Sequence, residues 1–159
     1  MKKKITVAIA GLGSRGKDTY AKAAKLFADR MEIVAVADIV PEKVREAAKE
    51  YGIPEDRCFD SAESLLREKR LADVLFICTM DRQHYGHAVP ALKKGYHLLL
   101  EKPVSPVLAE CLEIEETAKK YGRHVVVCHV LRYTPFYQEL KRLINVGTIG
   151  DVVSIQAIE

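Results

Sequence analysis

The stretch from residue 5 to residue 38 constrains the fold of this chain most. A β-branched apolar run covers residues 5–10, and a glycine-rich hexapeptide, Gly11-Leu12-Gly13-Ser14-Arg15-Gly16, follows at once. An Ala- and Lys-rich helical pattern comes next, then a second apolar run over residues 33–37, which ends at Asp38. This order of strand, glycine turn, helix, strand and acid is typical of a unit that binds a dinucleotide.

Each part of this stretch has a physical task if the ligand is a dinucleotide. Gly11 makes the tight turn, Gly13 lets the backbone approach a pyrophosphate, and Gly16 lets the helix pack close to the strand. The free N–H groups of a helix that begins near Ser14 would face the phosphates. Asp38 follows Gly16 at close to the spacing of about 20 residues at which a carboxylate accepts from a ribose 2′-hydroxyl.

The same residues favour NAD over NADP. Asp38 would repel a 2′-phosphate, and Ile39 offers no positive charge to hold one. Arg15 could stack on an adenine or reach a phosphate. A purely structural glycine turn is the alternative. We expect the cofactor to contact Gly11, Leu12, Gly13, Ser14, Arg15, Gly16, Asp38 and Ile39.

Composition narrows the functional class. The 159 residues are 48% hydrophobic and 30% charged, and the net charge of +3 is spread along the chain, which favours an ordinary soluble protein without a nucleic-acid surface. No apolar run approaches the ~20 residues that span a bilayer, and no signal peptide is evident, so we expect a cytoplasmic protein without a membrane role. The four cysteines form no C-x-x-C pair, which argues against a zinc or redox site.

The remaining pattern alternates apolar runs with helical segments. It predicts a doubly wound parallel α/β sheet with strand order 3-2-1-4-5-6. We expect Asp60 and Glu63 to form a capping box. The expected helices are residues 14–30, 41–51, 60–69, 84–94 and 105–121, and the strands after the second are residues 57–59, 74–78, 96–100 and 124–128.

Two polar loops follow strands at the carboxyl edge of this sheet, where ligands bind in open α/β folds. Thr79, Met80 and His84 follow one strand, and we expect them to border the adenosine half of the cofactor. The next strand delivers Glu101 and Lys102 to the same edge. His84 and His87 could face together as metal ligands, but no third ligand is evident, so we expect no metal.

The pattern changes after residue 128. Residues 135–147 form an amphipathic helical pattern, and residues 152–159 partly alternate with period two, which predicts an antiparallel strand. A terminal strand without a partner would leave its backbone groups unpaired. We therefore expect a dinucleotide-binding domain at 1–128, and at 129–159 the linking helix and first strand of a truncated second domain.

With these residues placed, the chain resembles the Gfo/Idh/MocA oxidoreductases. The resemblance covers all 159 residues, and Glu101-Lys102-Pro103 is its specific part. The other matching elements are Gly11–Gly16, Ala37-Asp38, Thr79 with His84 before a helix, Gly95-Tyr96-His97, Arg132-Tyr133-Thr134-Pro135 and Gly147-Thr148-Ile149-Gly150.

The resemblance implies a Rossmann domain followed by a mostly antiparallel α/β domain that carries substrate residues and contacts within a homo-oligomer. Members typically move a hydride between a sugar, polyol or cyclitol carbon and the nicotinamide. By resemblance, Lys102 is the catalytic lysine near the substrate hydroxyl, and Glu101 helps order the site. Arg132 could approach the nicotinamide or hold the linker through a salt bridge. The family's D-x-x-x-H stretch is absent from this sequence, so we expect NAD binding without useful turnover.

Lys102 also makes sense without the resemblance, because an ammonium beside a positive nicotinamide has its charged form disfavoured, which suits proton transfer. The alternative is that Lys102 is a surface lysine in a loop, without a catalytic role. Two other functions stay open: an NAD-dependent glycosidase of the same family shape, and a non-catalytic NAD-sensing protein.

Overall fold

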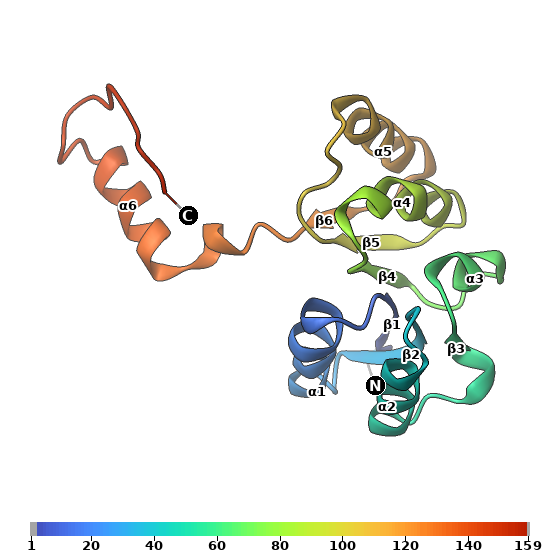
Figure 1. Ribbon diagram of the computed structural model, residues 1–159. Helices are drawn as coiled ribbons and strands as arrows, with labels where there is room; N and C mark the ends of the chain where they lie inside the picture. Colours follow the sequence, from blue (N-terminus) through green and yellow to red (C-terminus); the bar gives the residue numbers. More distant parts are fainter. Residues whose placement is uncertain (1–2, 159) are drawn as a thin grey trace. The chain divides into compact units, whose positions relative to one another are not determined.

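The structure, a computed structural model, describes residues 3–158, which divide into two compact units, one ending at Cys128 and one beginning at His129. A six-stranded sheet forms the centre of the first unit (Figure 1). Its strands are β1 (Ile5–Ala10), β2 (Met31–Ala37), β3 (Cys58–Phe59), β4 (Val74–Ile77), β5 (His97–Leu100) and β6 (Val125–Val127).

All strands are parallel and lie in the order β3-β2-β1-β4-β5-β6, which confirms the predicted doubly wound sheet. The strand order reverses beside β1, which pairs with β2 on one side and β4 on the other. This reversal creates a crevice at the carboxyl ends of β1 and β4, the usual ligand position in such sheets.

Helices cover both faces of the sheet. They are η1, a π-helical segment (Ser14–Ala21), α1 (Lys22–Leu26), α2 (Pro41–Tyr51), α3 (Ala62–Arg67), α4 (His84–Lys93) and α5 (Leu108–Tyr121), with short 3₁₀ turns η2 (Glu55–Arg57) and η3 (Asp81–Gln83). Because side chains alternate along a strand, Val7 and Ile9 pack with η1, α1 and α2, whereas Ala8 and Ala10 face α3, α4 and α5.

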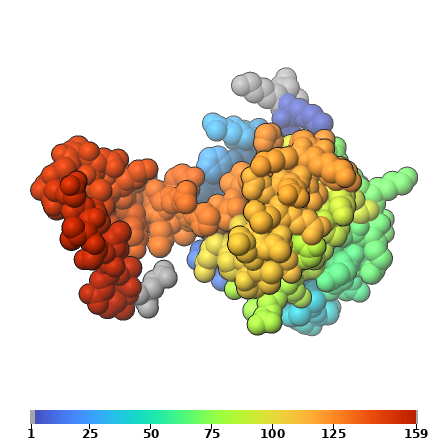
Figure 2. Space-filling view, turned by 90° about the horizontal axis from the view of Figure 1, so that it is seen from above, coloured from blue at the N-terminus to red at the C-terminus, as the bar shows by residue number. Residues whose placement is uncertain are grey.

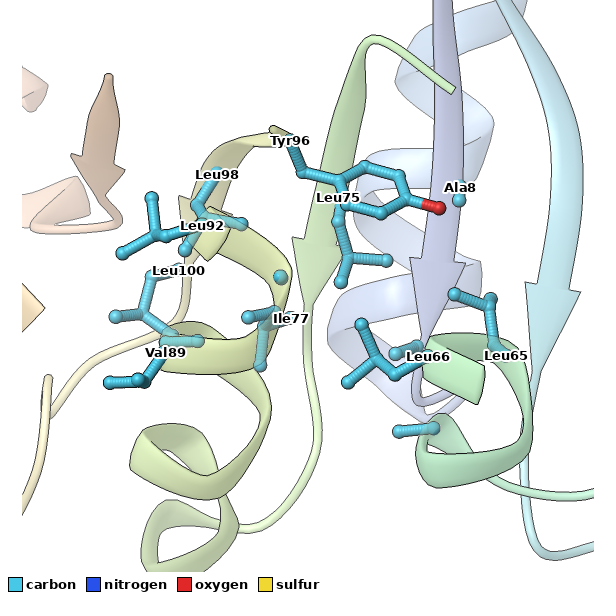
Figure 3. Packing of buried hydrophobic residues seen from close by; sticks show 14 of the residues in the cluster. Ala8, Leu65, Leu66, Leu75, Ile77, Val89, Leu92, Tyr96, Leu98 and Leu100 are labelled. Carbon is cyan, nitrogen blue, oxygen red and sulfur yellow. The ribbon is translucent and has the colours of Figure 1, made fainter. Parts of the chain in front are cut away.

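The face that carries α3, α4 and α5 holds the larger core. Figure 3 shows Leu75 and Ile77 of β4 among side chains of the flanking helices, with Leu98 and Leu100 of β5 nearby. The Tyr96 ring is fully buried in this cluster, and its hydroxyl accepts from Leu71 N–H at 2.8 Å. Helices α4 and α5 pack side by side, and their atoms form a continuous surface in Figure 2.

The first helical segment departs from the prediction. The expected helix over 14–30 is instead η1 followed by α1, which ends at Leu26, and β2 begins at Met31 rather than at residue 33. Phe27 leaves the helical conformation (φ −115°, ψ 31°), and its side chain is 47% exposed. The helix therefore ends before residue 30, because the chain turns away at Phe27.

Two helix starts were also predicted wrongly. The capping box of α3 joins Ser61 and Ser64, not Asp60 and Glu63, since the Ser61 hydroxyl accepts from Ser64 N–H and the Ser64 hydroxyl contacts Ser61 N–H. Helix α5 begins at Leu108 rather than near Ser105. The Ser105 hydroxyl instead accepts from Val107 N–H at 3.0 Å, a local turn that competes with the helix.

The second unit contains η4 (Val130–Tyr133) and α6 (Pro135–Asn145), and Gly147 follows α6 with φ +74°. The strand predicted for 152–159 is wrong over residues 152–158, where the chain has no strand. A strand needs a hydrogen-bonding partner, and in the described residues none lies beside this segment. Residue 159 lies outside the described range. No helix within residues 3–158 has the length and apolar character needed to cross a membrane.

Candidate functional site

Four loops converge at the carboxyl edge of the sheet. Backbone hydrogen bonds continue the parallel ladder just past the strand ends: Gly11 N–H donates to Ala37 O and Cys78 N–H to Ala10 O, both at 2.8 Å. Glu101 N–H donates to Ile77 O at 3.0 Å. The glycine turn and the residues after β2, β4 and β5 are therefore held side by side as extensions of a rigid sheet.

A cavity of about 210 Å³ opens between three of these loops. Pockets that enclose a drug-sized ligand are about 300–1,000 Å³, so this one suits part of a dinucleotide. Of the residues predicted from the sequence, the cavity wall contains Gly11, Gly13, Asp38, Ile39, Thr79 and Met80. It also contains polar residues that sequence reasoning missed: Lys43, Glu63, Gln83 and His87.

The three glycines differ in the space around them. A Cβ on Gly11, whose φ is +92°, would lie 2.4 Å from Cys78 O, and one on Gly16 would lie 1.8 Å from Gly11 O. A side chain at either position would therefore force the turn, the helix and β4 apart. A Cβ on Gly13 would meet nothing within 4 Å. The glycine at position 13 thus keeps open space beside the cavity, as a closely approaching ligand requires.

The residues between the glycines point in different directions. Leu12 is 2% exposed and belongs to the core, so its side chain is no ligand contact, although its backbone lies in the turn. Ser14 and Arg15 are exposed at the start of η1, where no side chain caps the helix. The first amides of a helix lack intrahelical partners, so this helix end presents N–H donors beside Gly13.

Asp38 has a task that sequence reasoning missed. The residue is 9% exposed, and its carboxylate accepts from Leu12 N–H at 2.6 Å and from Val40 N–H at 2.9 Å, which ties the glycine turn to the end of β2. Each carboxylate oxygen has two lone pairs, so one bond to each leaves acceptor capacity on the side that lines the cavity. The carboxylate can shape the turn and still accept from a hydroxyl.

Thr79 is held by two histidines of α4. His87 Nδ1 lies 3.0 Å from the Thr79 hydroxyl, and His87 Nε2 lies 2.9 Å from Glu63 Oε1. His84 Nε2 lies 3.1 Å from the Thr79 carbonyl oxygen, and His84 Nδ1 lies 2.7 Å from the Pro103 carbonyl oxygen. His84 is fully buried and lies outside the cavity wall. It therefore joins the loops after β4 and β5 from beneath.

The hydrophobic parts of the cavity wall are open to solvent. Ile39 is 81% exposed and Met80 is 74% exposed, and both line the cavity. Side chains of this kind could cover the flat face of an aromatic base. Cys78 also lines the cavity, but burial raises the pKa of its thiol well above the usual range. A protonated thiol is a poor nucleophile, so Cys78 contributes packing there.

The loop after β5 carries a buried acid and an exposed amine. Glu101 is 7% exposed, accepts from the Tyr20 hydroxyl and also accepts from Lys102 N–H at 3.2 Å. Burial, together with hydrogen bonds to Cys128 and Glu101, raises the pKa of Tyr20, which keeps this hydroxyl a donor. Lys102 is exposed, and within residues 3–158 its Nζ makes no hydrogen bond or ion pair. The Lys102–Pro103 peptide bond is cis.

Arg132, the remaining predicted contact, lies in the second unit. There it lines a groove with Leu131, Tyr137, Gln138 and Lys141, and its side chain is exposed. The first unit thus brings together Gly11, Gly13, Asp38, Ile39, Thr79 and Met80, while Lys102 stands on the neighbouring loop of the same sheet edge.

Comparisons with known proteins identify the family of the chain. Residues 5–129 match the model of the Gfo/Idh/MocA group, described as an oxidoreductase family with an NAD-binding Rossmann fold. The chain is 31% identical over 146 residues to the inositol 2-dehydrogenase/D-chiro-inositol 3-dehydrogenase of Lactiplantibacillus plantarum, which covers 91% of the chain and 41% of that protein. It is 28% identical over 154 residues to glycosyl hydrolase family 109 protein 2 of Phocaeicola vulgatus, covering 93% of the chain and 37% of that protein.

Among solved structures, the WlbA dehydrogenase of Bordetella pertussis in complex with NADH and UDP-GlcNAcA superposes with a TM-score of 0.81 at 26% identity. The match covers 91% of this chain and 43% of that one. The chain thus spans about two fifths of the length of the relatives it matches. Because the family model matches most of the chain, including the glycine turn and the loops after β2, β4 and β5, the chain belongs to the Gfo/Idh/MocA oxidoreductase family.

Proposed function

We propose that this chain is the NAD-binding part of an oxidoreductase that transfers a hydride between a nicotinamide and a carbon of a sugar, polyol or cyclitol. One observation carries the proposal. The cavity at the switch point of the sheet combines a glycine turn without room for side chains at Gly11 and Gly16, an open space at Gly13, and the Asp38 carboxylate. These are the features that a pyrophosphate and a ribose require.

NAD, when bound, supplies the acceptor for the hydride. The chain's own residues bind and orient it: the amides at the start of η1 meet the phosphates, and Asp38 accepts from the adenosine ribose. Arg15 reaches a phosphate from its exposed position. Ile39 and Met80 cover the adenine.

Lys102 is the proposed catalytic residue. Its exposed amine stands on the loop after β5, and the backbone beside it is fixed by Glu101, which Tyr20 holds in turn. A lysine amine in this position can hold or release a proton at the substrate hydroxyl. Glu101 acts as a positioning residue, because it touches the Lys102 backbone rather than the reacting atoms.

We further propose that residues 129–159 begin a substrate domain like that of the longer relatives, with Arg132 near the nicotinamide. The chain by itself then binds NAD but does not turn over substrate usefully, since hydride transfer needs the carbon held in near-attack geometry. In a longer protein the same site would serve a homo-oligomeric enzyme.

A titration with NADH tests the central claim. The chain has no tryptophan, so the cofactor's own fluorescence can be followed without interference from indole. We expect saturable binding, and NADH should bind at least about tenfold tighter than NADPH, a difference of about 1.4 kcal/mol. Lys43 also lines the cavity and could attract a 2′-phosphate, so a tighter NADPH complex would reject the preference for NAD. No saturable signal from folded protein would reject the function.

The position of Lys102 can be tested separately by amine labelling. Reductive methylation with and without NAD, read by mass spectrometry, should show protection of Lys102 on binding. Lys93, exposed at the end of α4, is the internal control and should label equally in both samples. Equal labelling of Lys102 in both samples would contradict its placement beside the nicotinamide.

A glycosidase is the second candidate, favoured by the similarity to the Phocaeicola vulgatus protein. Such an enzyme would use the same NAD site but return the hydride within one turnover. A full-length protein that releases sugar from a glycoside without net NADH formation would support this alternative, and stoichiometric NADH formation from a free polyol would exclude it.

A further inference from the structure

Three residues, Glu63, His87 and Thr79, form a continuous chain of hydrogen bonds along the cavity wall. Glu63 Oε1 lies 2.9 Å from His87 Nε2, and His87 Nδ1 lies 3.0 Å from the Thr79 hydroxyl. The imidazole is 3% exposed, and all three residues line the same cavity as Asp38. The chain therefore runs from solvent at Glu63, through a buried ring, to a hydroxyl at the cavity surface.

The hydrogen bond between Glu63 and His87 determines which atom donates in the hydrogen bond between His87 and Thr79. An ionised carboxylate can only accept, so His87 Nε2 must carry the proton that Glu63 receives. The hydrogen bond from His87 holds the pKa of Glu63 below its usual range, which keeps the carboxylate ionised. A neutral imidazole with a proton on Nε2 has a bare Nδ1, which can only accept. In that form of the ring, the Thr79 hydroxyl donates its one proton to His87 Nδ1.

The backbone of Thr79 is also held in place. Its carbonyl oxygen lies 3.1 Å from His84 Nε2, and His84 is fully buried. With its proton committed to His87, the Thr79 oxygen offers only lone pairs to the cavity. Asp38, on the loop after β2, likewise offers only lone pairs to the same cavity.

We propose that Glu63 and His87 act as positioning residues that fix the Thr79 hydroxyl as a hydrogen-bond acceptor, so that the cavity selects a ligand group with a donor at this point. This inference rests on the proposed function, and for a dinucleotide the donor is a ribose hydroxyl or the amino group of adenine. The prediction concerns the adenosine half of the ligand, because the same cavity contains Asp38 and Ile39.

The tautomer of His87 can be measured without any ligand. In protein labelled with ¹⁵N-histidine, long-range ¹H–¹⁵N correlations near pH 7.5 should show His87 as the neutral form with its proton on Nε2. Among the five histidines, the signals of His87 are identified by their loss in His87→Asn. In Glu63→Gln the amide can accept or donate, so the tautomer should become mixed. A wild-type His87 protonated on Nδ1, or on both nitrogens, would overturn the proposal.

Binding gives the second test, with matched variants. Thr79→Val keeps the shape but removes the hydroxyl, so NADH affinity should fall about three- to tenfold, whereas Thr79→Ser should stay within about twofold. His87→Asn keeps an acceptor near Nδ1 and should bind NADH better than His87→Gln, which keeps only a group near Nε2. Circular dichroism and urea unfolding identify variants that fold. Equal affinities of folded wild type and Thr79→Val would overturn the inference.

Ligand analogues distinguish the two donors. If the adenine amino group is the partner, the losses of binding free energy from Thr79→Val and from the hypoxanthine analogue of NADH should be non-additive. If a ribose hydroxyl is the partner, the losses from Thr79→Val and from a deoxyribose analogue should be non-additive. Additive losses with both analogues would overturn the inference. Failure of the wild-type chain to bind NADH would instead reject the proposed function and with it the ligand assignment. The His87 spectrum would still test the chain of hydrogen bonds from Glu63 through His87 to Thr79.

Discussion

At the scale of single residues, the site depends on where side chains are missing as much as on where they stand. Gly11 and Gly16 leave no room for a Cβ, because the glycine turn touches β4 and the helix touches the turn. Gly13 has ample room within the protein and a φ of −75°, which any residue can adopt. The fold therefore does not require a glycine at this position, which supports the proposed contact between Gly13 and a ligand.

This difference predicts the effect of Gly13→Ala. The free energy of unfolding should be unchanged or slightly higher, because the backbone conformation suits alanine, while NADH affinity should fall at least about tenfold. Urea unfolding and fluorescence titration measure the two effects. Gly86→Ala is the matched control, since Gly86 also has open space around it but lies within α4. Undiminished NADH binding by Gly13→Ala would contradict the assigned role.

A second residue prediction concerns pH. Burial, with nearby Arg123 and the stacked His124 ring, lowers the pKa of His97, whose Nδ1 accepts from His124 N–H at 3.0 Å. In the unfolded chain, His97 therefore binds a proton below about pH 6.5. In the folded chain it binds this proton only at lower pH. Stability contributed by the neutral ring is complete above that pH and is lost as the pH falls through the lowered folded-state value.

Urea midpoints at pH 7.5 and 5.5 check this expectation. The wild type should lose more stability on acidification than His97→Asn, because asparagine retains an acceptor for His124 N–H but does not titrate. Parallel losses in the two proteins would show that His97 does not carry the effect.

At the scale of elements, strands were easier to predict than helix ends. The runs at residues 5–10 and 74–77 are continuous and apolar because both faces of a parallel sheet are buried, so periodicity and order alone gave the sheet. The start of α3 was misassigned because Asp60 and Ser61 are adjacent and both can cap. Only the backbone shows that Ser61, with φ −161° and ψ 159°, holds the cap position.

The cap makes a specific prediction for α3. Ser61→Ala should lower the free energy of unfolding by about 1 kcal/mol, because it leaves Ser64 N–H without its acceptor. Asp60→Ala, at the position favoured by sequence, should cost less. Ser154→Ala, exposed and outside any helix or strand, is the neutral control. Urea unfolding measures these differences. A larger loss of unfolding free energy in Asp60→Ala than in Ser61→Ala would contradict the assignment of Ser61 as the cap.

The candidate site was only partly predictable from the sequence, because some of its residues lie on helices whose packing the sequence pattern does not determine. Gly11 and Asp38 stand immediately after strands and Thr79 two residues after one, where order along the chain fixes position. Lys43, Glu63 and His87 instead reach the cavity from helices, and which side of a helix faces a cavity depends on packing that no spacing rule contains. The sequence analysis named His87 with His84 only as possible metal ligands, whereas in the structure the two rings contact different partners.

At the scale of the molecule, the first unit contains the whole cavity. Every residue of the cavity wall lies between positions 11 and 87, and within 129–158 no residue is buried. A truncated chain of residues 1–128 should therefore keep the urea midpoint and the NADH affinity of the 159-residue protein.

Arg132→Ala in the 159-residue chain is the matched control for this truncation. It should also bind NADH like the wild type if Arg132 acts only once a substrate domain is present. A weakened complex in both the truncation and Arg132→Ala would contradict the expectation and give Arg132 a direct contact with the cofactor.

All cavity loops leave the sheet at one edge, so the opposite edge offers a practical attachment point. The turn between α1 and β2, with exposed Asp29, joins the two elements at the amino-terminal end of β2. A dye coupled to Asp29→Cys would sit the full length of a strand away from Asp38. Such a labelled protein could be immobilised or used as an optical reporter for coenzyme screening without crowding the coenzyme.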